Sequence, residues 1–176
     1  NTQKNPGRLF SDVTADNANG LYIRYAVERG IFQGFPDGSF KPGEGLTRAQ
    51  VAVVMVKAAG LKINDGDSPF TDVSPDYWAA PYIKAAANAG YIKGFPDGSY
   101  RPDAVLTRAQ GIALLMQMCT HNDRAVLPML EDMNQNHWAA EPMAVALAAE
   151  MIGLSADGKN VYPDAEFSRG SLARAL

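Results

Sequence analysis

The hexapeptide Gly-Phe-Pro-Asp-Gly-Ser occurs twice in this chain, letter for letter, at Gly34–Ser39 and sixty residues later at Gly94–Ser99. The pentapeptide Leu-Thr-Arg-Ala-Gln recurs with the same spacing, at Leu46–Gln50 and Leu106–Gln110. Such a fixed period is typical of repeat architectures, in which each unit packs against its neighbours. The repeat therefore constrains the fold more than any single residue does.

A third, weaker copy fills the rest of the 176-residue chain, from Leu130 to Ser171, with one extra residue before Pro163. Units of about sixty residues with two short helices bury too little surface to fold alone. We therefore predict one interdependent module of three repeats, at 1–62, 63–122 and 123–176.

The second repeat carries helix signals at two places. Ser74–Asp76 combines a capping serine, a first-turn proline and an acid, and it predicts a helix over 76–88. Thr107–Gln110 has the form of a capping box and predicts a second helix over 108–119. The sequence thus predicts an all-α fold of helix-loop-helix units.

The second helix of the first repeat, Val51–Val56, is apolar almost all round. A helix without a polar face is buried on several sides. Neighbouring repeats must therefore cover it.

Composition excludes several function classes. The net charge is −3 with a pI near 5.3, so the chain has no basic footprint for nucleic acid and no polybasic membrane patch. No apolar run reaches the ~18 residues needed to span a bilayer. One cysteine and two distant histidines form no metal-ligand cluster. We expect no metal and no cofactor.

No catalytic motif of a hydrolase, a phosphate-binding enzyme or a metalloprotease occurs in the chain. Glu131 and Asp132 are adjacent, but neighbouring loop residues usually diverge, so they are a poor candidate for a glycosidase acid/base pair. His121 and His137 stand apart from other candidate catalytic groups. We expect no catalytic residue and therefore no enzyme.

The combined pattern resembles the S-layer homology repeat: Phe-x-Asp, tryptophan, Gly-x-x-x-Gly-Phe-x-Asp-Gly and Leu-Thr-Arg-Ala-Gln, from Phe10 to the C-terminus. The resemblance implies a pseudo-threefold assembly around a central helical bundle, with grooves between repeats that bind secondary cell-wall polysaccharide, often through a pyruvylated sugar. It also implies an extracellular module of the bacterial cell wall that belongs to a larger surface protein. The chain ends within a predicted helix, which favours a larger parent protein.

Three arginines match the position that meets the acidic ligand in this family: Arg48, Arg108 and Arg169. Chemistry supports this role, because a guanidinium fork matches a carboxylate and the adjacent helix N-terminus offers spare backbone donors. The alternatives are an exposed helix-start residue or an ion pair that joins repeats.

Trp78 and Trp138 match the family's tryptophan, whose ring can stack on a sugar, whereas Ala18 occupies this position in the first repeat. The alternative is that both rings form core between repeats. Three aspartates match the Phe-x-Asp position, where they could accept from a sugar hydroxyl or cap a helix: Asp12, Asp72 and Asp132.

The remaining matches line the groove in the family: Gly34, Phe35, Gly94 and Phe95. Glycine lets a ligand approach closely. The third repeat carries Leu154 instead and departs at Ser171, while Gln50 and Gln110 replace the family's glutamate.

We expect each groove to join the arginine of one repeat to the entry segment of the next. This rule predicts the following pairings: Arg48 with Asp72 and Trp78, Arg108 with Asp132 and Trp138, and Arg169 with Asp12 and Ala18. The Arg169 groove, which we expect to contain Leu154, would then be the weakest. The alternative function is a protein interaction module for S-layer lattice assembly.

Overall fold

The computed structural model describes residues 9–14, 16–64, 67–119 and 125–176. Six helices lie in these ranges: α1 (Gly20–Glu28), α2 (Arg48–Ala58), α3 (Ala80–Asn88), α4 (Arg108–Met116), α5 (Ala140–Ala148) and α6 (Arg169–Ala175). The described residues contain no strand, only three isolated bridges. The predicted all-α class is confirmed.

The inner helices α2, α4 and α6 begin at side-chain caps. The Thr47 hydroxyl accepts from the Gln50 N–H at 3.3 Å, and the Gln50 side chain accepts from the Thr47 N–H at 2.9 Å. Thr107 and Gln110 form the same capping box before α4, and Ser168 caps α6. The capping-box prediction is confirmed, and its residues fix where each candidate arginine stands.

The outer helix of the second repeat starts later than we expected. The predicted helix over 76–88 begins at Ala80, because the Ser74 hydroxyl and carbonyl close a turn instead of capping a helix. The Ser74 carbonyl accepts from the Tyr77 N–H at 2.9 Å. Trp78 therefore stands on a turn before α3, where its ring is exposed and lies beside that of Tyr77.

The predicted end of α4 is also slightly wrong. The α-helical pattern stops at Met116, and the chain continues to Cys119 through bonds to the third preceding residue, such as the Cys119 N–H to the Met116 carbonyl at 3.2 Å. A tightened last turn of this kind is common at helix ends.

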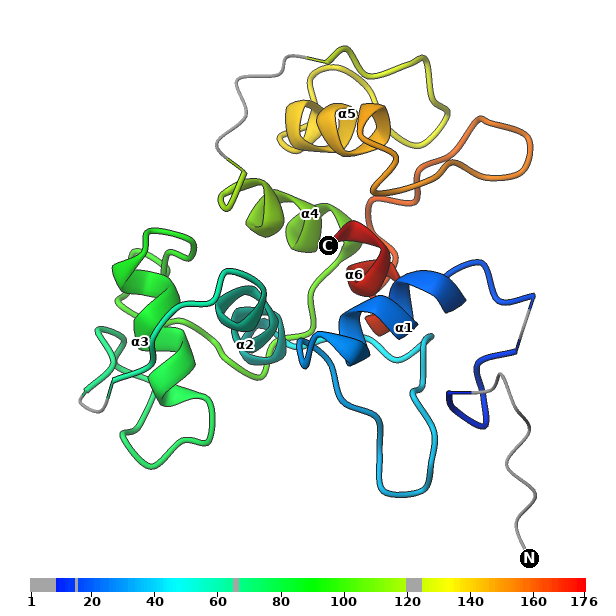
Figure 1. The fold of residues 1–176 in the computed structure, drawn as a ribbon. Coiled ribbons are helices and arrows are strands. Elements are labelled where there is room, and N and C mark those ends of the chain that lie inside the picture. Colours follow the sequence, from blue (N-terminus) through cyan, green and yellow to red (C-terminus); the bar gives the residue numbers. More distant parts are fainter. Residues whose placement is uncertain (1–8, 15, 65–66, 120–124) are drawn as a thin grey trace, which may run out of the picture.

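Each inner helix packs against the outer helix of the following repeat. The pairs are α2 with α3, α4 with α5, and α6 with α1, and α4 also contacts α6. Figure 1 shows these three pairs arranged around a common centre. The third repeat therefore closes onto the first, as the expected pseudo-threefold assembly requires.

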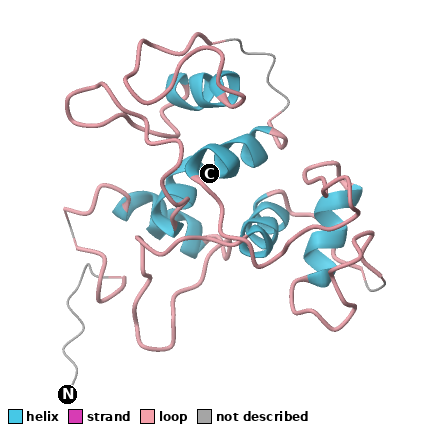
Figure 2. Ribbon diagram, turned by 180° about the vertical axis from the view of Figure 1, so that it is seen from behind, coloured by secondary structure: helices cyan, strands magenta, loops and turns pink. Residues whose placement is uncertain are grey.

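A ring of three backbone hydrogen bonds marks the pseudo-threefold axis. Leu46 N–H donates to the Phe167 carbonyl, Leu106 N–H to the Leu46 carbonyl, and Phe167 N–H to the Leu106 carbonyl, at 3.0, 3.0 and 2.8 Å. All three side chains are buried. Figure 2 shows the loop segments that lead into the inner helices meeting between the helix pairs. One hub thus joins the three repeats.

The hub accommodates the large side chain of Phe167 because its neighbour Gly111 has no side chain. A Cβ atom at Gly111 would lie 2.1 Å from Phe167 Cδ1. Leu46 and Leu106 occupy the place of Phe167 in the first and second repeats, and Val51 and Leu172 occupy the place of Gly111 in the first and third. Close packing makes such exchanges compensate in volume.

The apolar helix α2 is buried on several sides, as we expected, with six residues inside the core: Ala49, Val51, Ala52, Val54, Met55 and Val56. Across the part of the chain that the structure describes, no helix has the length and apolar character required to cross a bilayer. The same part holds no group of three or more residues suited to binding a metal ion.

Candidate functional site

The Arg48 side chain lies across the loop of the second repeat. Its Nε donates to the Tyr100 carbonyl at 2.7 Å, and its Nη2 donates to the Lys93 carbonyl at 3.1 Å. The guanidinium carbon stands 4.4 Å from the centre of the Tyr100 ring and 5.1 Å from that of Phe95. Nη1 has no hydrogen-bond partner among the described residues. The guanidinium is therefore held in place while one nitrogen remains available.

Arg169 repeats this geometry on the first repeat. Its Nε donates to the Phe40 carbonyl at 2.8 Å and its Nη2 to the Gln33 carbonyl at 2.7 Å. The guanidinium carbon lies within 5.1 Å of the rings of Phe32, Phe35 and Phe40. The contact closes the ring of repeats.

Arg108 reproduces only half of the pattern. Its Nη2 donates to the Gly153 carbonyl at 2.8 Å, but its Nε is buried without a hydrogen-bond partner among the described residues. Within the described ranges no cation-π contact to Arg108 is found, and Ser155 and Val161 occupy the positions of Phe95 and Tyr100.

Burial lowers the pKa of all three arginines, Arg48, Arg108 and Arg169, because desolvation penalises the charged form. A guanidinium stays protonated at neutral pH even so. Each groove therefore contains a partly desolvated positive charge, which attracts an anion more strongly than an exposed one does.

The expected spare donors at the helix N-termini are already used. The Arg48 N–H donates to the Ala104 carbonyl at 3.0 Å, and the Ala49 N–H donates to the Pro102 carbonyl at 2.9 Å. Equivalent bonds hold the first two N–H groups of α4 and α6. This part of the sequence interpretation was wrong: these N–H groups join repeats and are not spare donors.

Asp72 holds the loop whose carbonyl groups accept hydrogen bonds from Arg48. Its two carboxylate oxygens accept from the N–H groups of Tyr100 and Arg101, both at 2.7 Å. Asp12 and Asp132 hold the equivalent loops in the same way. The residue at the second of these N–H groups has a positive φ, as at Arg101 (57°). The aspartates cap no helix, and they shape the groove through the loop.

The glycines of the repeated hexapeptide make room for a phenylalanine of the same repeat. A Cβ atom at Gly94 would lie 2.5 Å from Phe70 Cε1, and one at Gly34 would lie 2.1 Å from Phe10 Cε1. In the third repeat the phenylalanine is replaced by Leu130 and the glycine by Leu154. The two changes occur together because the positions pack together.

A groove of about 290 Å³ opens beside Arg48, and we call it the Arg48 groove. It is lined by Arg48, Tyr91, Lys93, Gln110, Ala113, Leu114, Gln117 and Trp138. These residues come from all three repeats, because α4 forms the floor and the turn before α5 brings Trp138 to its edge. The groove thus combines a fixed cation, a second cation and an aromatic ring.

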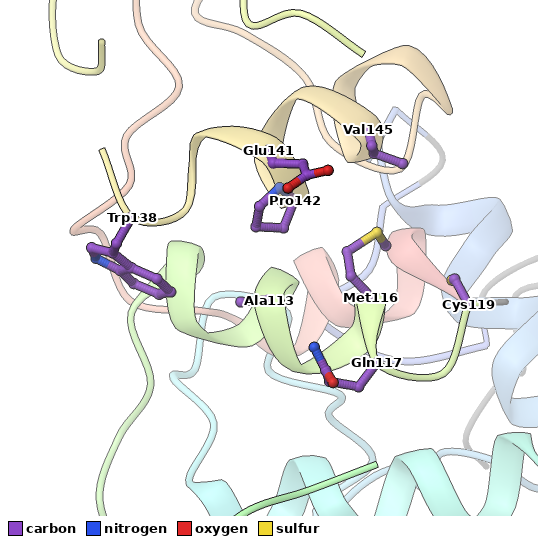
Figure 3. Close-up of a pocket in the computed structure, with 8 residues that line it drawn as sticks. All are labelled: Ala113, Met116, Gln117, Cys119, Trp138, Glu141, Pro142 and Val145. Atoms are coloured by element: carbon purple, nitrogen blue, oxygen red, sulfur yellow. The ribbon is translucent and has the colours of Figure 1, made fainter. Parts of the chain in front are cut away.

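A second pocket of about 400 Å³ continues from this groove between α4 and α5. The two share Ala113, Gln117 and Trp138, so the Trp138 ring stands where they meet. Figure 3 shows Trp138 at one end of this pocket, with Glu141 and Pro142 on the α5 side.

The predicted pairing of arginines with tryptophans was wrong by one repeat. Trp138 lies with Arg48, whereas Arg108 shares its groove with Ala18 and Leu154. The predicted pairing of arginines with aspartates is confirmed. The negative charge of Asp72 raises the pKa of Arg48, that of Asp132 raises the pKa of Arg108, and that of Asp12 raises the pKa of Arg169. Trp78 is the equivalent of Trp138 in the second repeat, and it stands before α3, which packs on α2 as α5 packs on α4.

Both tryptophans are exposed, Trp78 by 58% and Trp138 by 63%. The alternative that they form core between repeats is therefore wrong. An exposed indole beside a groove is placed for stacking on a ligand.

The sequence interpretation missed several groove residues, among them Tyr91, Lys93 and Arg174. Lys93 supplies the carbonyl that fixes Arg48, and its side chain lines the same groove. Nothing in the repeat pattern singles out this position, because Gln33 and Gly153 replace it in the other repeats.

Comparison with known proteins agrees with this geometry. The S-layer homology domain model matches residues 9–52 and 69–110. A cellulosome-anchoring protein of Acetivibrio thermocellus is 32% identical over 90% of this chain and 36% of its own length. An S-layer protein of Bacillus licheniformis is 27% identical over 97% of this chain and 20% of its own. An endoglucanase of Bacillus sp. strain KSM-635 is 32% identical over 66% of this chain and 12% of its own.

The chain thus spans little more than a third of the length of these relatives, or less. Its third repeat lies outside the matched residues, yet it is joined to its neighbours by the same backbone bonds and the same arginine contact. The repeated motifs, the closed ring of helix pairs and the matched domain model agree: this chain belongs to the S-layer homology family.

Proposed function

We propose that this module attaches its parent protein to the bacterial cell wall by binding an anionic secondary cell-wall polysaccharide in the Arg48 groove. One observation carries the proposal. A desolvated guanidinium, fixed by two loop carbonyls and with Nη1 unpartnered among the described residues, lines the same groove as an exposed tryptophan.

The ligand group that fits this arrangement is a carboxylate on a sugar, as in a pyruvyl ketal. A carboxylate would take a charge-assisted bond from Arg48 Nη1, and Lys93 adds a second positive charge. The Trp138 ring offers its face to the apolar side of a pyranose. The guanidinium is fixed before binding, so little conformational entropy is lost on binding.

The Arg169 groove is the second proposed glycan site. Arg169 makes the same two carbonyl bonds as Arg48, and pseudo-threefold symmetry gives it Trp78. The Arg108 groove is the least suited to sugar, because it has Ala18 in place of the tryptophan and the Leu154 side chain in its lining. This ranking reverses our sequence-based expectation for the Arg169 groove.

The relatives support an attachment role that is separate from catalysis. Proteins named for cellulosome anchoring, for the S-layer and for endoglucanase activity share this segment although it is a small part of each. A function common to such different proteins is attachment to one structure. We propose that the chain is a non-catalytic part of a larger, extracellular, cell-wall-associated protein.

Sedimentation with purified cell-wall sacculi tests this proposal. We expect the module to sediment with sacculi that carry the secondary polymer and to stay in solution after the polymer is removed. Binding that survives removal of the polymer would overturn the proposal. Self-association of the module without sacculi, together with no difference between the two preparations, would favour a lattice-assembly role instead.

A further inference from the structure

The Arg108 groove differs from the other two by a second arginine. This groove of about 290 Å³ is lined by Ala18, Asn19, Arg108, Met151, Ile152, Gly153, Leu154, Tyr162, Ser171 and Arg174. Arg174 is the sixth residue of α6, where α2 has Val53 and α4 has Ala113. Two guanidinium groups therefore line one groove.

Gly153 lies against the second guanidinium and has no side chain to compete with it for space. The Arg108 Nη2 donates to the Gly153 carbonyl at 2.8 Å, and Arg174 Nη1 lies 3.4 Å from the place where a Cβ of Gly153 would stand. The equivalent positions, which also supply the carbonyl acceptor, are Gln33 and Lys93. A long side chain at 153 would take the space of Arg174, so the glycine and the arginine act as a pair.

The hydrogen-bonding capacity of this groove is largely unused. A guanidinium has five N–H donors. Arg108 uses one of them on Gly153, and its Nε is buried without an acceptor among the described residues. Arg174 Nε makes a long bond of 3.3 Å to the Glu150 carbonyl. No described residue accepts a hydrogen bond from Arg108 Nη1 or from the terminal nitrogens of Arg174, so an anion in the groove could take charge-assisted bonds from them.

The positive charges in this groove are also uncompensated. Among the described residues, neither Arg108 nor Arg174 forms an ion pair with a carboxylate. Asp132 is the acid whose charge acts on Arg108, and both of its carboxylate oxygens accept hydrogen bonds from the N–H groups of Val161 and Tyr162. Two like charges held together repel each other, and an anion with two negative charges removes that repulsion.

We propose that the Arg108 groove binds a phosphate group. A phosphate monoester is a dianion with three terminal oxygens, and guanidinium groups bind such oxygens in a bidentate manner. Ser171 and Asn19 line the same groove and add uncharged polar groups. None of the described residues that line this groove is a tryptophan, so we expect the groove to recognise the anion and not the apolar face of a sugar. The Arg48 groove, with one fixed guanidinium, a lysine and Trp138, suits a monoanionic sugar acid instead.

Titration calorimetry with inorganic phosphate tests this inference on the whole chain. We expect one phosphate to bind, acetate at the same concentration to bind at least tenfold more weakly, and Arg174→Ala to weaken phosphate at least tenfold. Arg101→Ala removes the same charge from the loop of the second repeat and should leave phosphate binding unchanged. Equal loss in both variants, equal affinity for acetate, or no binding to the unaltered chain would overturn the proposal.

A transplant provides a second test that does not depend on loss of function. Lys93→Gly with Ala113→Arg rebuilds the glycine and arginine pair in the Arg48 groove. We expect this double variant to bind a second phosphate, and Ala113→Arg alone to bind it at least fivefold more weakly, because Lys93 still fills the space. A double variant that binds no second phosphate while its melting temperature is unchanged would contradict the proposed role of Gly153.

The source of the phosphate is distinguished by a hexose 6-phosphate. Tighter binding of the sugar phosphate than of inorganic phosphate identifies a phosphorylated glycan as the ligand, and equal affinities identify free phosphate. The inference does not depend on the proposed wall attachment. Sacculus binding is assigned to the Arg48 groove, whereas the calorimetry with phosphate and Arg174→Ala concerns the Arg108 groove alone.

Discussion

The Arg48 and Arg108 grooves have the same backbone and different chemistry. In both, the first N–H of an inner helix bonds to an alanine carbonyl of the next repeat, Ala104 or Ala165, at 3.0 and 2.7 Å. In both, the arginine Nη2 bonds to a loop carbonyl, that of Lys93 or Gly153. The side chains around this frame then differ. The backbone bonds between repeats thus give the two grooves the same frame, and we propose that the side chains around this frame determine which ligand each groove binds.

The largest expected effect comes from the shared hub. Gly111→Val places a side chain against Phe167, whose ring leaves no room for even a Cβ atom. Overpacking a core costs typically 1–3 kcal/mol, and we expect about 3 kcal/mol here. Chemical denaturation measures the loss, and one transition should report all three repeats because they share the hub.

Phe167→Leu is the matched control, since leucine stands at this place in the other two repeats as Leu46 and Leu106. Alone it should destabilise by about 1 kcal/mol through a cavity. Combined with Gly111→Val it should recover most of the lost stability. A double variant no more stable than Gly111→Val would show that the two positions do not compensate.

The next effect concerns the loop clamps. Asp72→Asn replaces one carboxylate oxygen by an amide group that cannot accept from Arg101 N–H. We expect a loss of about 2 kcal/mol in the free energy of unfolding, because hydrogen bonds to charged groups contribute about 1.5–3 kcal/mol. Asp132→Asn should cost a similar amount but leave glycan binding unchanged, whereas Asp72→Asn should weaken it. Equal glycan affinity in both variants would break the assignment of sugar to the Arg48 groove.

A smaller effect is expected from Trp138, the aromatic residue at the edge of the Arg48 groove, which has no equivalent in the Arg108 groove. Trp138→Ala removes an exposed ring, so the melting temperature should hardly change. Glycan affinity should fall by about 1.5 kcal/mol, or roughly tenfold. Trp138→Phe should retain part of the affinity. If calorimetry finds the alanine variant as tight as the unaltered chain, stacking on Trp138 is wrong.

The smallest effect compares the two loops at low pH. Hydrogen bonds from Ser99, and then from Arg101, lower the pKa of Asp97 to about 2, whereas Asp157 has Tyr162 in the place of Arg101 and a pKa that is lowered less. A depressed pKa stabilises the fold above the ordinary value near pH 4, and this contribution is lost as the pH falls through the folded value. Carboxyl NMR titration should therefore show Asp97 titrating at lower pH than Asp157. If Asp97 and Asp157 titrate with the same midpoint pH, Arg101 does not contribute to the lowered pKa of Asp97.

Much of the fold could be predicted from local signals. The capping boxes at Thr47 and Thr107 fixed where α2 and α4 begin, because both partners lie within four residues. The start of α3 could not be predicted in this way. A serine followed by a proline suits both a helix cap and a tight turn, and the structure uses Ser74 for the turn.

The grooves were less predictable because they depend on contacts between distant segments. Pairing Arg48 with Trp78 assumed that a groove joins consecutive repeats. The packing of α4 against α5 brings Trp138 from a third repeat instead. Likewise, Gly153 and Arg174 each differ from the residues at the same positions of the other repeats. The sequence does not show that these two residues lie side by side, as they do in the structure.

Calorimetry of the whole module with a pyruvylated cell-wall glycan, and with its counterpart lacking the pyruvyl group, measures whether Arg48 binds a carboxylate. A carboxylate bound by Arg48 contributes a charge-assisted hydrogen bond, so the pyruvylated ligand should bind at least about tenfold tighter. Trp138→Ala should weaken both ligands by the same factor, because it acts on the sugar face and not on the carboxylate. Equal affinity for the two ligands would contradict the account.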